Sequence, residues 1–214
     1  MNAFDYWSIA QGALATVVLS VASIVLGVPL GLGLALIRWA RVPFLNRVVV
    51  AYVSLIRSCP AVTLTLLIFF ALPQFGISLD PTPAAILALT ISTAAFNCEI
   101  WRAALINFPR DQYDAALAFA MPRTVRFRRI VMPQIWRASL PGLVNEMTLQ
   151  IKSTPAVAVI GIVEITRAAL RVGARTYDPL PPFVFALVLY GLIVFVLIKA
   201  QRVIERRQPV EARA

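Results

Sequence analysis

Long uncharged stretches recur along the chain and predict helices that cross a membrane. Residues 13–37 contain no charged side chain, and about 20 apolar residues suffice for a helix to cross roughly 30 Å of hydrocarbon. Further apolar stretches follow at 58–79, 82–105 and 180–199. Proline and glycine within the first stretch, such as Pro29 and Gly31, are tolerated in membrane helices.

A fifth span is predicted at 136–161, although a strict hydropathy scan would miss it. Between residues 138 and 163 the chain is apolar except for Glu146 and Lys152, with Asn145 and Gln150 adding polarity. Leaving this segment out would deprive a largely apolar stretch of a lipid or protein environment. The sequence therefore predicts an all-α membrane protein, in which residues 1–214 form one transmembrane domain of about five helices.

Composition supports the membrane class and excludes several others. Hydrophobic residues make up 60% of the chain and charged residues only 14%, whereas soluble domains have about 25% charged residues. A net charge of +10 could indicate nucleic-acid binding, but the arginines cluster beside apolar stretches, as in membrane loops. Histidine is absent, which excludes His-based catalysis and His metal ligation; no catalytic residue and no metal site is predicted.

The distribution of Lys and Arg predicts the orientation. Basic residues concentrate after the first span, after the third span and in the C-terminal tail: Arg38, Arg41, Arg47, Arg57, Arg110, Arg123, Arg126, Arg128, Arg129, Arg137, Lys199, Arg202, Arg206 and Arg207. With five spans these segments share one side, which the positive-inside rule assigns to the cytoplasm. The N-terminus is then outside and the C-terminus cytoplasmic. Arg167, Arg171 and Arg175 contradict this pattern, because they fall in an outside loop.

The segment 107–133, between the third and fourth spans, predicts two short helices outside the membrane. Pro109 suits the first turn of a helix. An apolar stripe at helical spacing comprises Tyr113, Ala116, Leu117 and Ala120. Pro122 can begin the second helix, which carries Arg123, Arg126 and Arg129 along one side. The physics alone fits two interpretations equally: a hairpin resting at lipid headgroups or one that docks to a partner protein.

This segment resembles the EAA loop of ABC import permeases. The residues that match its spacing are Asp114, Ala115, Ala116, Ala120, Ile130, Met132 and Pro133. In the family pattern Glu stands at position 114, Gly at 120 and Leu at 132. Without glycine the chain lacks the freedom for a left-handed turn at 120, so we expect the bend there to differ.

The resemblance extends along the chain to permeases for polar amino acids of the histidine and glutamine type. The matching segments are Glu99-Ile-Trp-Arg102, Pro133-Gln134, Leu140-Pro141, Asn145-Glu146, Lys152-Ser-Thr154 and Val159-Ile-Gly161. It implies an importer of a polar or basic amino acid, or a derivative such as an opine, in the bacterial inner membrane. It also implies three kinds of partner: an ATPase pair that docks on the coupling loop, a second permease subunit, identical or not, and an extracytoplasmic solute-binding protein.

The chain itself is not predicted to be an enzyme. It has no Gly-x-x-x-x-Gly-Lys-Ser/Thr loop for ATP phosphates, so ATP and Mg²⁺ belong on the partner ATPase. It also lacks His-Glu-x-x-His and Gly-x-Ser-x-Gly, which leaves an intramembrane enzyme strongly disfavoured. An ATP-independent secondary transporter or channel remains the alternative.

Charged residues inside predicted spans are candidates for function, because burying charge in lipid is costly. Glu99 and Arg102 are three residues apart, a spacing at which they can form a structural ion pair. Glu146 and Lys152 point in different directions on a helix, and Pro155 interrupts that helix just beyond Ser153. We predict that Glu146, helped by Asn145, faces the translocation path or the partner permease, with Lys152 and Ser153 on the same segment. The alternative is polar contact between helices.

Overall fold

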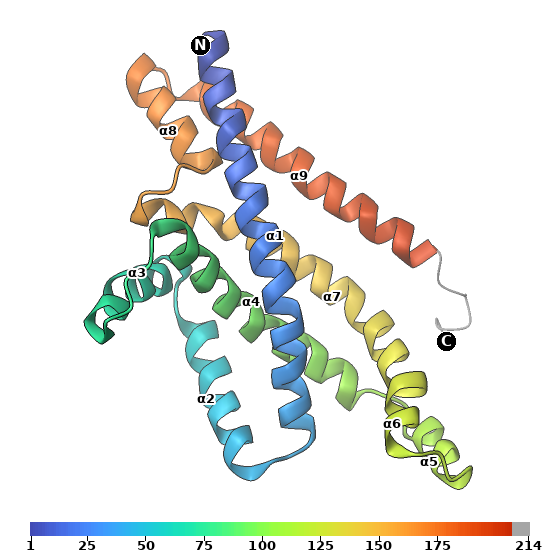
Figure 1. Cartoon of the computed structure of the whole chain (residues 1–214). Helices are drawn as coiled ribbons and strands as arrows, with labels where there is room; N and C mark the ends of the chain where they lie inside the picture. Colours follow the sequence, from blue (N-terminus) through green and yellow to red (C-terminus); the bar gives the residue numbers. More distant parts are fainter. Residues whose placement is uncertain (207–214) are drawn as a thin grey trace.

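The computed structural model describes residues 1–206 of the chain, and this part is helical, without β-strands. Residues 207–214, which include Arg207 of the basic tail and complete the predicted domain, lie outside it. The helices in chain order (Figure 1) are α1 (Ala3–Trp39), α2 (Pro43–Ser58), α3 (Ala61–Ala71), η1 (Leu72–Phe75), α4 (Pro81–Ile106), α5 (Arg110–Ala118), α6 (Arg123–Arg126), η2 (Phe127–Val131), α7 (Met132–Ser153), η3 (Thr154–Ile160), α8 (Ile165–Thr176) and α9 (Leu180–Arg206).

Helix α1 is the central element, and it packs closely along α4. Its first turn is capped by Asp5, whose Oδ2 accepts the backbone N–H of Asn2 at 2.8 Å. Small residues let the two helices approach: a Cβ at Gly27 would lie 2.7 Å from the Cβ of Thr93, and one at Gly31 would lie 2.8 Å from the Cβ of Asn97. Any larger residue at either glycine would force the helices apart.

A sharp bend marks the beginning of the predicted span 58–79, and the segment before it, predicted as a loop, forms helix α2. Helices α2 and α3 meet at a bend of 113°. The break lies at Cys59 and Pro60, because a residue before proline is driven out of the helical region, and Cys59 has ψ 129°. Helix α3 has only 11 residues and is followed by the short η1 turn. Arg57, which the charge pattern assigned to a cytoplasmic loop, instead ends α2.

Within residues 1–206, three helices are long and apolar enough to cross a membrane by themselves, namely α1, α4 and α9. The number rises to four if the bent α2–α3 pair is counted as one span. Helix α7 does not meet this criterion among the described residues, since Glu146, Gln150 and Lys152 lower its hydropathy. A fifth span at α7 stays a prediction, as do the boundaries of the spans.

Helix α7 ends two residues before Pro155. The α-helix stops at Ser153, and η3 continues with tighter turns from Thr154 to Ile160, closed by Gly161 with φ +103°. Pro155 removes a backbone N–H at this point. The chain then forms α8, an amphipathic helix in a segment that the sequence analysis treated as a loop.

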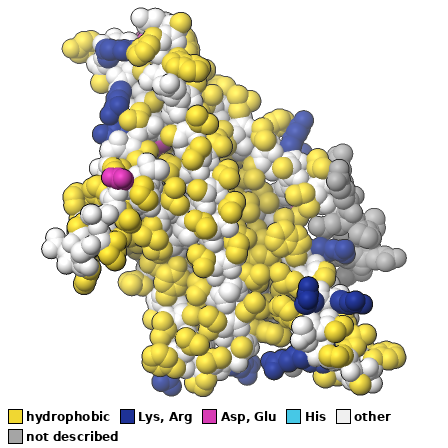
Figure 2. All heavy atoms as spheres, in the orientation of Figure 1, with side chains coloured by type: hydrophobic (Ala, Val, Ile, Leu, Met, Phe, Trp, Pro, Cys, Tyr) yellow, Lys and Arg dark blue, Asp and Glu magenta, His cyan; other side chains and the backbone are white. Residues whose placement is uncertain are grey.

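The two ends of the molecule are distinct. Helix α8 and the N-terminus lie at one end, and α5 and α6 lie at the opposite end (Figure 1). Hydrophobic side chains dominate the middle of the face shown in Figure 2, and several Lys and Arg side chains gather at the end that holds α5 and α6.

Candidate coupling and translocation sites

The hairpin between α5 and α6 is closed by a left-handed alanine. Ala120 has φ +50°; its N–H donates to the carbonyl of Leu117 at 2.8 Å, and the N–H of Met121 donates to that of Ala116 at 3.1 Å. This pair of bonds is the glycine-type helix C-cap known as the Schellman motif. The loss of glycine therefore does not remove the left-handed turn, but an alanine pays about 1–2 kcal/mol of steric strain to make it.

The predicted apolar stripe divides between an inward and an outward face. Ala116 is 3% exposed and Tyr113 is half-buried, packed against the core cluster that includes Val131. Leu117 and Phe119, in contrast, are 49% and 80% exposed. The surface open to a partner protein consists of Asp114, Ala115, Leu117, Phe119 and Ala120, while Pro133 is exposed and Ile130 half-buried further along.

Arg126, one of the predicted basic row, is buried and holds the hairpin together. Its guanidinium carbon lies 4.3 Å from the centroid of the Tyr113 ring. Its Nη2 donates to the Tyr113 hydroxyl at 3.0 Å, and its Nη1 to the carbonyl of Met121 at 3.5 Å. A second link joins Gln134 to Gln112 at 2.6 Å. The sequence could not separate Arg126 from its exposed neighbours Arg123 and Arg129, because all three share the helical spacing.

A pocket of about 480 Å³ lies between this hairpin and the ends of α1 and α4, lined by Trp39, Arg41, Leu105, Ile106, Phe108, Tyr113, Asp114 and Val131. Asp114 and Arg41 are the charged residues of this lining, and the other side chains are aromatic or aliphatic. The hairpin and the membrane helices meet through these side chains.

Glu99 forms the predicted pair with Arg102 and a second one that the sequence did not indicate. Its Oε2 lies 2.6 Å from Nη2 of Arg102, and its Oε1 pairs with Arg38 of α1. The nearby Trp101 donates its indole N–H to the carbonyl of Val28 at 3.2 Å. Two arginines on one carboxylate join α1 to α4, which favours the structural role predicted for Glu99 and Arg102. Because Arg38 is 61 residues away in sequence, spacing could not reveal it.

The candidate translocation residues on α7 separate onto different faces. Glu146 is only 7% exposed, whereas Asn145 and Lys152 are exposed. The Ser153 hydroxyl donates to the carbonyl of Leu149 at 2.9 Å. The structure therefore does not gather the four residues into one constellation, and Glu146 is the one that is directed into the protein.

Two polar groups accompany Glu146. Gln150, one turn further on, donates to Ser23 Oγ at 3.3 Å and to the carbonyl of Leu89 at 3.5 Å, so it joins α7 to α1 and α4. The positive charge of Arg57, at the end of α2, acts on Glu146 without an ion pair between the two within residues 1–206. Its guanidinium carbon lies 5.3 Å from the centroid of the Phe96 ring. The sequence analysis did not connect Arg57 with Glu146, because it assigned Arg57 to a basic loop and the two residues are far apart in sequence.

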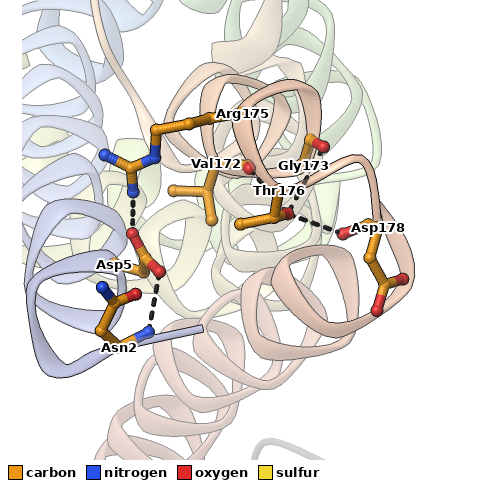
Figure 3. Close-up of polar contacts among 7 residues, drawn as sticks. All are labelled: Asn2, Asp5, Val172, Gly173, Arg175, Thr176 and Asp178. Carbon is orange, nitrogen blue, oxygen red and sulfur yellow. Dashed lines mark hydrogen bonds and ion pairs between the residues drawn. The ribbon is translucent and has the colours of Figure 1, made fainter.

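The opposite end of the molecule contains two further acidic residues with defined partners. Glu164 is fully buried and caps α8, accepting the N–H groups of Thr166 and Arg167 at 2.8 and 2.7 Å and the hydroxyl of Tyr190 at 2.8 Å. Asp5, also fully buried, pairs with Arg175 (Figure 3). These contacts fasten α8 to α1 and α9. Among residues 1–206 no group of three or more acidic, Cys or His side chains could hold a metal ion.

Comparison with known proteins identifies the family. Residues 27–209 match the family described as the inner membrane component of binding-protein-dependent transport systems. The chain belongs to this family. It is therefore a permease, the membrane part of a transporter, and not an enzyme, as the match to the EAA loop predicted.

Individual relatives agree with this assignment. The L-cystine transport system permease protein TcyB of Bacillus subtilis (strain 168) is 35% identical, covering 95% of this chain and 88% of its own length. The arginine transport system permease protein ArtQ of the same organism is 31% identical, covering 93% and 91%. The crystal structure of an amino acid ABC transporter with histidines has a TM-score of 0.85 at 29% identity and covers 94% of both chains. The ABC permease fold is thus shown, and an ATP-independent carrier is disfavoured.

Proposed function

We propose that this permease forms one half of the membrane pathway of an ATP-driven importer for a polar or basic amino acid or a derivative such as an opine. The observation that carries the proposal is the exposed α5–α6 hairpin at one end of a bundle that shares the fold of an amino acid ABC transporter. The names of relatives that transport cystine and arginine support the substrate class.

The hairpin is the coupling element. Its outward side chains, Leu117 and Phe119, are apolar and exposed, and they suit a groove on a separate ATPase subunit that binds ATP and Mg²⁺. The stacking of Arg126 on Tyr113 makes the hairpin stiff, so that a movement of the ATPase is passed to α4 and α7 rather than absorbed. Asp114, Ala115, Ala116, Ala120, Ile130 and Pro133 shape this element.

The end that carries the hairpin faces the cytoplasm, the N-terminus and α8 face outward, and the C-terminus is cytoplasmic. Support comes from exposed basic residues around the hairpin, namely Arg123, Arg128 and Arg129, which the positive-inside rule places in the cytoplasm. The partners are an ATPase pair, a second permease subunit, identical or different, and an extracytoplasmic solute-binding protein.

Glu146 and Arg57 form the substrate-recognising pair. A carboxylate on α7 suits the ammonium group of an amino acid, and a guanidinium on α2 suits its carboxylate. Asn145, Lys152 and Ser153 border the same segment, and the exposed Asn145 and Lys152 suit contact with the second permease. Glu146→Gln should weaken uptake or alter substrate preference at normal membrane levels, and wild-type uptake with unchanged preference would remove Glu146 from the path.

The coupling assignment is tested by purifying the tagged permease from native membranes and assaying ATP hydrolysis in what accompanies it. Leu117→Glu should release the ATPase, because a charge in an apolar groove must be desolvated. Val203→Glu, at a residue that is 52% exposed against 49% for Leu117, is the matched control and should retain it. A permease that purifies alone and carries solute into ATP-free vesicles would instead be a secondary transporter.

A further inference from the structure

Helix α8 carries a row of arginines that neither the coupling hairpin nor the substrate pair uses. Arg167, Arg171 and Arg175 are spaced four residues apart, so they share one face. The opposite face is apolar and buried against α1 and α9, with Ile165, Ala168, Ala169, Val172 and Gly173. The arginines lie off this buried face. Arg171 is exposed, whereas Arg175 reaches back to Asp5 of α1 and Arg167 to the carbonyl of Ala158 in η3.

The positions of α8 and α1 place this row at the outermost part of the molecule. A Cβ at Gly12 of α1 would lie 3.1 Å from the Cβ of Ala168, and Arg175 pairs with Asp5 near the start of α1 (Figure 3). Helix α8 thus runs from the level of Gly12 outward to that of Asp5. This level lies beyond residues 13–37, the uncharged stretch that crosses the hydrocarbon.

The basic charge of the row is only partly neutralised. The carboxylate of Glu164 accepts the backbone N–H groups at the start of α8. Asp5 pairs with Arg175, whose side chain is still 55% exposed. Arg167 donates to the carbonyl of Ala158 in η3. Arg171 is exposed and forms no ion pair within residues 1–206. Asp178 follows the row as an exposed acid, so the charges left open to an acidic partner are those of Arg171 and of the exposed part of Arg175.

A protein fits this surface better than a membrane. An interfacial helix inserts its own apolar face into the lipid, but the apolar face of α8 is covered by α1 and α9. Next to the row, Tyr177 is 94% exposed at the turn into α9, in the left-handed conformation with φ +56°. Exposed Tyr beside Arg is the composition typical of hot spots in protein–protein interfaces.

We propose that Arg171, Arg175 and Tyr177 form a docking surface for the solute-binding protein, which contacts it with acidic side chains. The inference rests on the orientation and the binding-protein partner proposed above. Opposite charges accelerate encounter, and exposed ion pairs are weak enough to release the binding protein in every cycle. The bond from Arg167 to Ala158 joins the surface to η3 and hence to α7, which carries Glu146.

The test uses the complete transporter in nanodiscs of neutral phosphatidylcholine, titrated with the purified solute-binding protein that stimulates its ATP hydrolysis. Arg171→Glu should raise the half-saturating concentration of binding protein about tenfold and leave basal ATP hydrolysis unchanged. The effect should shrink as salt is added, since exposed charges are screened. Arg202→Glu, an exposed arginine on α9, is the matched control and should not shift the titration.

Three other results of this titration would each overturn a proposal. A half-saturating concentration that Arg171→Glu leaves unchanged would overturn the docking surface while the importer assignment stands. A defect seen only when phosphatidylglycerol is added to the nanodiscs would make the row a lipid site and overturn it as well. A wild-type complex whose ATP hydrolysis responds to no binding protein would instead overturn the proposed function on which the inference depends.

Discussion

The α5–α6 hairpin and the α8–α9 turn, at opposite ends of the molecule, share a construction but differ in surface chemistry. Each has a non-glycine residue in the left-handed conformation, Ala120 with φ +50° and Tyr177 with φ +56°. Each is also fastened by an arginine, through Tyr113 at the hairpin and through Asp5 at the outer end.

The two ends differ in how far their arginine side chains are exposed. At the hairpin Arg126 is 7% exposed, and the tip that remains accessible is apolar. At the outer end the side chain of Arg175 is 55% exposed, and the charge itself is accessible. An apolar tip suits a partner that stays attached, whereas accessible charge suits one that arrives by diffusion and leaves again. Under the proposed function, the same device would serve a permanent subunit at one end and a transient one at the other.

The largest effect is expected from breaking the hairpin's internal contact with Arg126→Ala. It removes a stacked cation and hydrogen bonds from a charged donor, together about 2–3 kcal/mol. The hairpin should become sensitive to trypsin, and transport should fall while ATP hydrolysis continues, because the coupling element is no longer stiff. Arg128→Ala, at an exposed arginine two residues away, should change neither property. Intact coupling in Arg126→Ala would show that the hairpin does not need this contact.

The corresponding anchor at the outer end is Glu164, and its removal should cost nearly as much. Glu164→Ala leaves the backbone N–H groups of Thr166 and Arg167 without their acceptor and leaves the Tyr190 hydroxyl with Thr166 alone, a loss of about 2 kcal/mol. We expect a lower midpoint of thermal unfolding in detergent and a weaker response to binding protein, with the ATPase still attached. Asp178→Ala, at an exposed acid whose Oδ1 accepts only one N–H at 3.3 Å, should leave the midpoint unchanged. Release of the ATPase by Glu164→Ala would mean that the two ends are not independent.

The sequence predicts parts of this architecture well. Residues 13–37, 82–105 and 180–199 lie within α1, α4 and α9, because an uncharged stretch long enough to cross lipid has few alternatives to a helix. The pairing of Glu99 with Arg102 follows from their spacing. The predicted span 58–79 begins at the bend between α2 and α3, which the dipeptide Cys59-Pro60 signals. Helix α2 itself lies in a segment that was predicted as a loop, because its arginines lower the mean hydropathy.

Other features depend on contacts between distant segments and leave little local signal. Arg38 reaches Glu99 across 61 residues, and Arg126 differs from Arg123 only because Tyr113 covers it. Helix α8 was detectable: Ile165, Ala168, Ala169 and Val172 recur at helical spacing. A search for membrane spans passes over such a segment because its charged face lowers the mean hydropathy.

The smallest expected effect on stability, about 1 kcal/mol, comes from placing glycine at the left-handed residue of each turn, Ala120 or Tyr177. Glycine adopts positive φ without steric cost, so Ala120→Gly and Tyr177→Gly should each relieve about 1 kcal/mol of backbone strain. At the hairpin, where the alanine side chain contributes little beyond its backbone shape, we expect a slightly higher unfolding midpoint with coupling unchanged. At the outer tip the same relief removes an aromatic ring that is 94% exposed. Stability should therefore hold or rise while the half-saturating concentration of binding protein increases. If Tyr177→Gly leaves that concentration unchanged, the tyrosine is only a turn residue, and recognition at the outer end rests on the arginines alone.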